Sequence, residues 1–146
     1  MSPLKQYVCL SHTPWREAPT RTQQLMTRLT QAQVLFFEPP GPDWRRPARK
    51  PRPNLTVYTL PQIPEVEERH HLLFRRRYRR LARFIAGCLE RRRFREPVLW
   101  TDTPESVHLL DLLPHRALVY DCGQAWSDLP VRWESDLALA ADVIFA

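Results

Sequence analysis

The sequence predicts an α/β fold in which a mostly parallel sheet carries helices on both faces. Short apolar runs, which are typical of buried strands, alternate along the chain with longer segments whose apolar residues recur at helical spacing. This alternation is characteristic of parallel sheets that are covered by their own crossover helices. With 146 residues, of which 43% are hydrophobic, the chain has the size and composition of one folded domain.

Six short segments have the composition of buried strands. They consist mostly of aliphatic and aromatic residues, and several of them stop at Pro, Asp or Glu. The segments are residues 6–11, 34–37, 55–60, 97–100, 116–120 and 143–145. Residues 39–53, between the second and third segments, are rich in Pro and Arg, and we expect no regular structure there.

Four segments are predicted to be helical, at residues 21–31, 65–93, 103–113 and 131–141. Thr20 is a suitable N-cap for the first helix, and Pro104 suits the first turn of the third. The second and longest helix repeats apolar residues at helical spacing from Phe74 to Leu89. Three glutamates between residues 65 and 68 lie at its predicted start and three arginines at its end, an arrangement that the helix dipole favours.

Charge is distributed unevenly along the chain. Residues 45–95 contain 16 Lys+Arg and 4 Asp+Glu, a balance of +12, whereas the remaining residues have a balance of −6. The densest cluster lies in the longest predicted helix and consists of Arg75, Arg76, Arg77, Arg79 and Arg80. These arginines could contact anionic lipid headgroups or the phosphates of a nucleic acid, or they could form a solvated helix face.

Several common kinds of site are not indicated. The chain has neither a G-x-G-x-x-G nor a G-x-x-x-x-G-K-[ST] motif, so a phosphate-binding loop is not expected. Cys9, Cys88 and Cys122 are far apart, and we expect neither a disulfide nor a metal site. Neither a run of about 18 apolar residues nor a signal peptide is visible. We therefore expect a cytoplasmic protein, placed peripherally at the inner face of the membrane if its arginines bind lipid.

Three motifs occur in order near the N-terminus. Residues 11–15 read S-x-x-P-W, residues 21–25 read R-x-Q-x-L, and the predicted strand at 34–37 runs into E-x-P. This order resembles the start of bacterial GT-B glycosyltransferases of the family 1/4-like type. Residues 99–104, 119–122 and 140–145 resemble later strand ends of the same N-terminal domain. The resemblance therefore extends from about residue 7 to residue 145.

The resemblance implies a Rossmann-like domain that forms the N-terminal, acceptor-side half of a two-domain enzyme. Such an enzyme transfers a sugar from a nucleotide-sugar donor to the hydroxyl of an acceptor, for example a lipid-linked sugar or a polysaccharide. Residues 1–146 would form one domain that binds no cofactor of its own, and the donor-binding C-terminal domain would lie outside these residues. We therefore expect the chain alone to transfer no sugar. The sequence leaves open which sugar is moved and whether the reaction is inverting or retaining.

The resemblance and the predicted strand ends together single out five residues. Ligands of doubly wound sheets bind at the carboxyl ends of the strands, so we expect His12, Asp102 and Asp121 to lie at one edge of the sheet. These three are the expected catalytic residues, with His12 as a general base and the carboxylates orienting a hydroxyl or a partner. Trp15 would offer an apolar platform to a sugar or lipid, and Arg21 would contact an anionic group or brace its loop. For each residue, turn capping is the alternative role.

A second hypothesis comes from a different class of function. The chain could be a non-catalytic binding module whose Arg-rich helix contacts a nucleic acid or an acidic partner. Few aromatic residues lie between the arginines, which argues against a surface for single-stranded nucleic acid. No specific nucleic acid partner is therefore expected.

Overall fold

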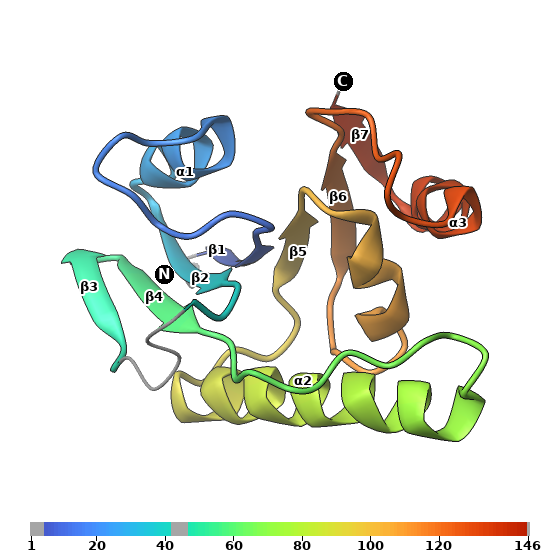
Figure 1. Ribbon diagram of the computed structural model, residues 1–146. Helices are drawn as coiled ribbons and strands as arrows, with labels where there is room; N and C mark the ends of the chain where they lie inside the picture. Colours follow the sequence, from blue (N-terminus) through green and yellow to red (C-terminus); the bar gives the residue numbers. More distant parts are fainter. Residues whose placement is uncertain (1–4, 42–46, 146) are drawn as a thin grey trace.

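The computed structural model describes residues 5–41 and 47–145, which form a seven-stranded sheet with its helices (Figure 1). The strands lie in the order β3-β4-β2-β1-β5-β6-β7, and every neighbouring pair is parallel except β3 and β4. The strands are β1 (Lys5–Leu10), β2 (Ala32–Glu38), β3 (Arg49–Arg52), β4 (Leu55–Thr59), β5 (Val98–Thr101), β6 (Ala117–Asp121) and β7 (Val143–Phe145). The helices are α1 (Arg21–Thr27), α2 (His71–Arg91), the 3-10 helix η1 (Pro104–Leu109) and α3 (Val131–Ala140). The predicted α/β fold with a mostly parallel sheet is confirmed.

Alternate residues of the central strands point to opposite faces of the sheet and build two cores. In β1, Val8 and Leu10 belong to the larger core, which α2, η1 and α3 cover, whereas Cys9 belongs to the smaller core with Met26 of α1. In Figure 1, α2 runs along one side of the sheet and α1 lies on the other. Because the central strands are buried on both faces, they form nearly continuous apolar runs in the sequence.

The structure contains one strand that the sequence analysis did not predict. Strand β3 pairs antiparallel with β4, with Arg49 opposite Val57 and Arg52 opposite Leu55. Pro51 has no N–H to donate, but β3 is an edge strand, where one side of the backbone needs no partner. The expectation that residues 39–53 lack regular structure is therefore wrong for Arg49–Arg52. Residues 42–46 of the same segment lie outside the described residues.

The longest helix begins later than predicted. Helix α2 starts at His71, so the three glutamates between residues 65 and 68 precede it, and its first turn contains no acidic residue. The carboxylate of Glu68 instead pairs with Arg132 and accepts a hydrogen bond from the indole of Trp133. These contacts tie the segment to α3. The predicted match between acidic residues and the dipole is therefore wrong at this end of the helix.

Two other helices are also shorter than predicted. Helix α1 ends at Thr27 instead of residue 31, and η1 is a 3-10 helix that ends at Leu109 instead of a helix that reaches residue 113. Thr20 caps α1 as predicted, because its hydroxyl accepts the N–H of Gln23 at 3.3 Å. The cap fixes where α1 begins, and α1 begins close to the carboxyl end of the sheet.

The connections of the sheet diverge between its two central strands, β1 and β5. From β1 the chain passes through α1, on the smaller core, to β2. The chain reaches β5 through α2, which lies on the opposite face. Doubly wound sheets bind their ligands at the carboxyl ends of the strands where such crossovers diverge. His12 follows β1 and Asp102 follows β5, so both lie at this position.

Candidate functional site

His12 and Asp102 form a hydrogen-bonded pair at the carboxyl ends of β1 and β5. Oδ1 of Asp102 lies 2.8 Å from Nδ1 of His12 and also accepts the backbone N–H of His12 at 2.8 Å. The side chain of Asp102 is 5% exposed and that of His12 is 31% exposed, so the imidazole is the accessible member of the pair. The carboxylate engages Nδ1, so Nε2 is the ring nitrogen that Asp102 does not bind.

Two hydroxyl groups fix the second oxygen of Asp102. Oδ2 accepts hydrogen bonds from Oγ1 of Thr22 at 2.7 Å and from Oγ of Ser11 at 3.4 Å. Thr22 is buried in the first turn of α1, and Ser11 is buried directly after β1. Asp102 therefore connects the ends of β1, β5 and α1, and this connection orients the imidazole of His12.

The pKa of His12 is raised above its ordinary value. The hydrogen bond to Asp102 is the main cause, burial of the ring acts in the opposite direction, and the charge of Asp102 and the side chain of Gln124 add smaller upward contributions. A raised pKa makes the imidazole a stronger proton acceptor than a free imidazole. The pair therefore has the arrangement of a general base that a buried carboxylate holds in one orientation.

Asp121, at the carboxyl end of β6, forms an ion pair with Arg21 of α1. Nη2 of Arg21 lies 3.1 Å from Oδ1 of Asp121, whose side chain is 2% exposed compared with 52% for Arg21. Within the described residues, this oxygen receives no hydrogen bond of good geometry, because the guanidinium approaches without directing an N–H at it. Burial raises the pKa of Asp121, the charge of Arg21 lowers it, and the charge of Asp102 raises it. Oδ1 is itself buried beneath the guanidinium of Arg21, so the accessible member of this ion pair is Arg21.

The three predicted catalytic residues lie at one edge of the sheet, and this part of the prediction is confirmed. His12, Asp102 and Asp121 line a cavity of about 270 Å³ together with Arg21 and Thr22. A larger cavity of about 920 Å³ lies on the α2 side of the same edge. His12 lines both cavities and is therefore placed between them.

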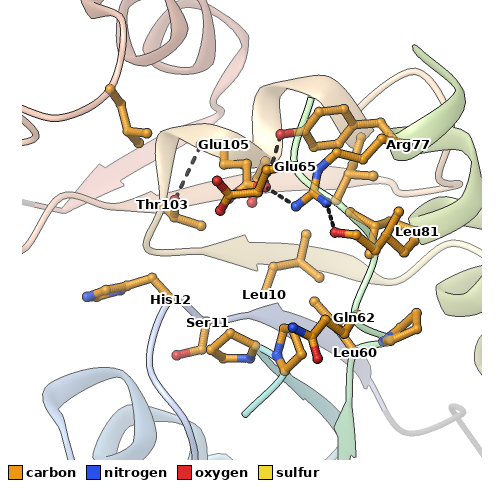
Figure 2. A pocket seen from close by; sticks show the side chains of 18 of the residues that line it. Leu10, Ser11, His12, Leu60, Gln62, Glu65, Arg77, Leu81, Thr103 and Glu105 are labelled. Carbon is orange, nitrogen blue, oxygen red and sulfur yellow. Dashed lines mark hydrogen bonds and ion pairs between the residues drawn. The ribbon is translucent and has the colours of Figure 1, made fainter. Parts of the chain in front are cut away.

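The larger cavity has an apolar part and a charged wall (Figure 2). Nη1 of Arg77 donates to the carbonyls of Ile63 and Pro64, the latter at 3.1 Å, and Nη2 lies 3.7 Å from Glu105. The hydroxyl of Tyr78 donates to the same carboxylate at 3.0 Å. These contacts hold α2, η1 and the segment that follows β4 together. The apolar part comes from Leu10, Leu60, Leu81 and Leu109.

Trp15 lies away from both cavities. Its indole packs edge-on against Phe36 of the smaller core, with 5.1 Å between the ring centroids, and lines neither cavity. In this position Trp15 does not offer an apolar platform to a ligand in either cavity, as had been predicted. Trp126, which the sequence analysis did not single out, lines the larger cavity and packs edge-on against His12 at 5.0 Å. The sequence feature that could have indicated Trp126 is its position in the loop after the fifth predicted strand.

Glu38 anchors the loop that carries His12. In the sequence it was visible only as the residue at which a predicted strand stops. Glu38 is 2% exposed, and its Oε2 accepts the backbone N–H of Trp15 at 2.8 Å. Its Oε1 accepts hydrogen bonds from Arg49 at 2.8 Å and from Thr59 at 2.7 Å. Glu38 therefore holds the loop after β1 against β2, β3 and β4, which makes it a positioning residue for the site.

The structure divides the predicted arginine cluster. Arg75, Arg76, Arg79 and Arg80 are exposed on the side of α2 that faces away from the sheet. Arg77 lies on the flank of the helix, its side chain is 16% exposed, and it lines the larger cavity. Arg77 therefore does not share the exposed surface of the other four arginines, with which it was grouped in the sequence.

The described part of the chain shows neither a metal site nor a membrane-spanning helix. Residues 5–41 and 47–145 contain no group of three or more His, Cys, Asp or Glu side chains arranged to hold a metal ion. None of the helices described is long and apolar enough to cross a membrane.

Comparison with models of known protein families finds no match to this chain, and comparison with curated proteins finds none either.

Proposed function

We propose that this chain is the N-terminal, acceptor-side domain of a GT-B glycosyltransferase, which transfers a sugar from a nucleotide-sugar donor to an acceptor hydroxyl. The observation that carries the proposal is the His12–Asp102 pair, a base held by a buried carboxylate at 2.8 Å. His12 lines both cavities, at the position where doubly wound sheets bind their ligands. The order of the N-terminal sequence motifs supports the same family.

In the proposed reaction, His12 removes the proton of the attacking hydroxyl. Nε2 accepts this proton as the hydroxyl oxygen bonds to the anomeric carbon of the donor sugar and the bond from that carbon to the phosphate oxygen of the nucleotide breaks. Asp102 stabilises the imidazolium that forms, and the proton then passes to solvent. Asp121 would hold the exposed guanidinium of Arg21 in place, and that guanidinium would donate a hydrogen bond to a sugar hydroxyl.

The charges around the cavities favour a hydroxyl-bearing acceptor over a nucleotide. Carboxylates outnumber arginines in the lining of the two cavities. The arginines are Arg21 and Arg77, both paired with carboxylates, and the carboxylates are Glu65, Asp102, Glu105, Asp121 and Asp128. A diphosphate would be repelled by these carboxylates. The proposal therefore assigns the acceptor to these cavities and the nucleotide to a second domain.

The test measures sugar transfer by the product of the complete reading frame that contains these residues, with the 146-residue chain assayed beside it. The 146-residue chain should be inactive, because the acceptor oxygen and the donor must be held about 3–3.5 Å apart. In the complete product, His12→Ala should lower kcat about 10²–10⁴-fold, the range that a positioned base contributes. His71→Ala is the matched control, because His71 is exposed on α2 and lines neither cavity.

The pH profile separates a base from a residue that only supports the fold. The rate should rise as pH passes upward through the raised pKa of His12, because only neutral imidazole accepts a proton. Asp102→Asn should move this rise to lower pH and reduce the plateau, since the carboxylate no longer raises the pKa. Unchanged kcat in His12→Ala, or sugar transfer by the 146-residue chain alone, would refute the proposal. Tight oligonucleotide binding together with such a result would favour the binding module.

A further inference from the structure

One side of α2 carries positive charge along most of its length and is not covered by the rest of the described chain. We call this side the outer face of α2, and it consists of Leu72, Arg75, Arg76, Arg79, Arg80 and Arg83, all of which are exposed. The buried side of the helix, which includes Phe74, Leu81 and Ile85, packs into the larger core. In Figure 1, α2 lies at the border of the molecule, and no other element lies beyond it. The outer face is therefore available to a partner.

The charge of the outer face is of one sign. Between His71 and Leu89, helix α2 contains no acidic residue, so nothing within the helix neutralises its five outer arginines. None of these five forms an ion pair within the described residues, in contrast to Arg77 on the flank, which lies 3.7 Å from Glu105. Such a surface attracts an anionic partner whose charge is spread over an area.

Two exposed leucines decide which anionic partner fits. Leu72 is 82% exposed and Leu73 is 55% exposed, and both lie in the first turn of α2, next to Arg75 and Arg76. A nucleic acid backbone offers phosphates and sugars at such a surface but no apolar layer for aliphatic side chains. The interface of a bilayer offers both anionic headgroups, which attract the arginines, and acyl chains, which the leucine side chains can enter.

We propose that the outer face of α2 docks onto an anionic lipid surface, with Leu72 and Leu73 entering the boundary between headgroups and acyl chains. This inference does not depend on the proposed sugar transfer. Each arginine close to an anionic surface strengthens binding about fivefold, so five arginines and two leucines suffice for reversible docking but not for permanent anchoring. Tyr78 and Leu81 on the buried side of the same helix line the larger cavity, so α2 would lie between that cavity and the lipid surface.

Cosedimentation with vesicles tests the docking. The probes are vesicles of phosphatidylcholine alone and vesicles in which about one third of the lipid is phosphatidylglycerol. The wild-type chain should sediment with the anionic vesicles only, and high salt should release it, because the Debye length falls from about 10 Å at 0.1 M to about 3 Å at 1 M. Equal binding to both vesicle types, or binding that high salt does not weaken, would overturn the proposal.

Matched variants locate the contact. Arg76→Gln/Arg79→Gln/Arg83→Gln should weaken binding to anionic vesicles about 100-fold, at about fivefold for each arginine. The control, which removes the same charge elsewhere on the surface, is Arg28→Gln/Arg52→Gln/Arg116→Gln, and its binding should fall less than about tenfold. If both triple variants lose affinity equally, only net charge matters and the outer face of α2 is not a docking site.

The leucines separate lipid from nucleic acid. Leu72→Ser/Leu73→Ser should weaken vesicle binding about tenfold or more, and it should not disturb folding, because both side chains are exposed. Thermal unfolding of every variant verifies that the fold is retained. Unchanged vesicle binding by the leucine variant overturns the insertion. Binding of an oligonucleotide that is tighter than binding of anionic vesicles, and that depends on Arg76, Arg79 and Arg83, assigns the face to nucleic acid instead.

Discussion

Removal of the Asp102 carboxylate should destabilise the loop that carries His12. In Asp102→Ala, the backbone N–H of His12 and the hydroxyl of Thr22 lose the acceptor that they now contact at 2.8 Å and 2.7 Å. A buried donor without a partner costs about 1–3 kcal/mol, so two such donors predict a loss of about 2–6 kcal/mol in the free energy of unfolding. Water can reach the part-buried N–H of His12, which favours the lower part of this range, about 2–4 kcal/mol. For a domain of this size, the melting temperature should fall by about 4–16 °C.

Two further variants identify the cause of this loss. Asp102→Asn keeps an oxygen for the N–H of His12, and its amide can donate to the hydroxyl of Thr22, so its cost should be less than half that of Asp102→Ala. Thr22→Val removes only the hydroxyl and should cost about 1 kcal/mol. Urea unfolding, followed by tryptophan fluorescence, measures all three changes. If Asp102→Ala stays within about 0.5 kcal/mol of the wild type, the carboxylate does not hold the site together and the reasoning is refuted.

The pH at which unfolding is measured adds a second check on the same pair. Because the pKa of His12 is raised in the folded state, its charged form stabilises the fold fully below the unfolded pKa of about 6.5, and this contribution is lost as pH rises through the folded pKa. The cost of Asp102→Ala should therefore be larger at pH about 6 than at pH about 8.5. A cost that is independent of pH would mean that the ion pair with His12 contributes nothing to stability.

Other parts of the molecule provide three independent predictions. Ile85 is 0% exposed, so Ile85→Ala should lower the free energy of unfolding in urea by about 2–5 kcal/mol, whereas Leu72→Ala, at a site that is 82% exposed, should change it by less than about 0.5 kcal/mol. Arg93 lies two residues after the end of α2 and has a φ of 59°, a conformation that favours glycine, so Arg93→Gly should raise the urea midpoint by an amount equal to about 0.5–1 kcal/mol, and a lower midpoint would contradict this. Burial lowers the pKa of His108, against smaller upward effects of Glu105 and Asp136, so the fold should lose stability as pH falls through about 6.5. His108→Phe should flatten that part of the stability profile, and an unchanged slope would show that His108 titrates normally.

The sequence by itself determined the class of the fold and the edge of the sheet at which the candidate site lies. Strands that are buried on both faces must be apolar throughout, so β1, β2, β4, β5 and β6 were visible as apolar runs between helical segments. The carboxyl ends of parallel strands meet at one edge, so His12, Asp102 and Asp121 could be placed together without knowledge of the strand order. Strand β3 was missed because its sequence, Arg-Lys-Pro-Arg, is polar, and its pairing depends on the neighbouring strand.

Only the tertiary structure decided which side chains are partners. His12 and Asp102 are 90 positions apart, and they meet because β1 and β5 are neighbours, an order that the succession of elements along the chain does not state. The same holds for Glu38, which appeared as a strand end and proved to be a buried anchor for the loop after β1. Arg77 and Trp15 make contacts that the sequence did not predict, for the same physical reason. Each side chain took the partner that its place on the folded chain brought within reach, the carbonyl of Pro64 for Arg77 and the ring of Phe36 for Trp15.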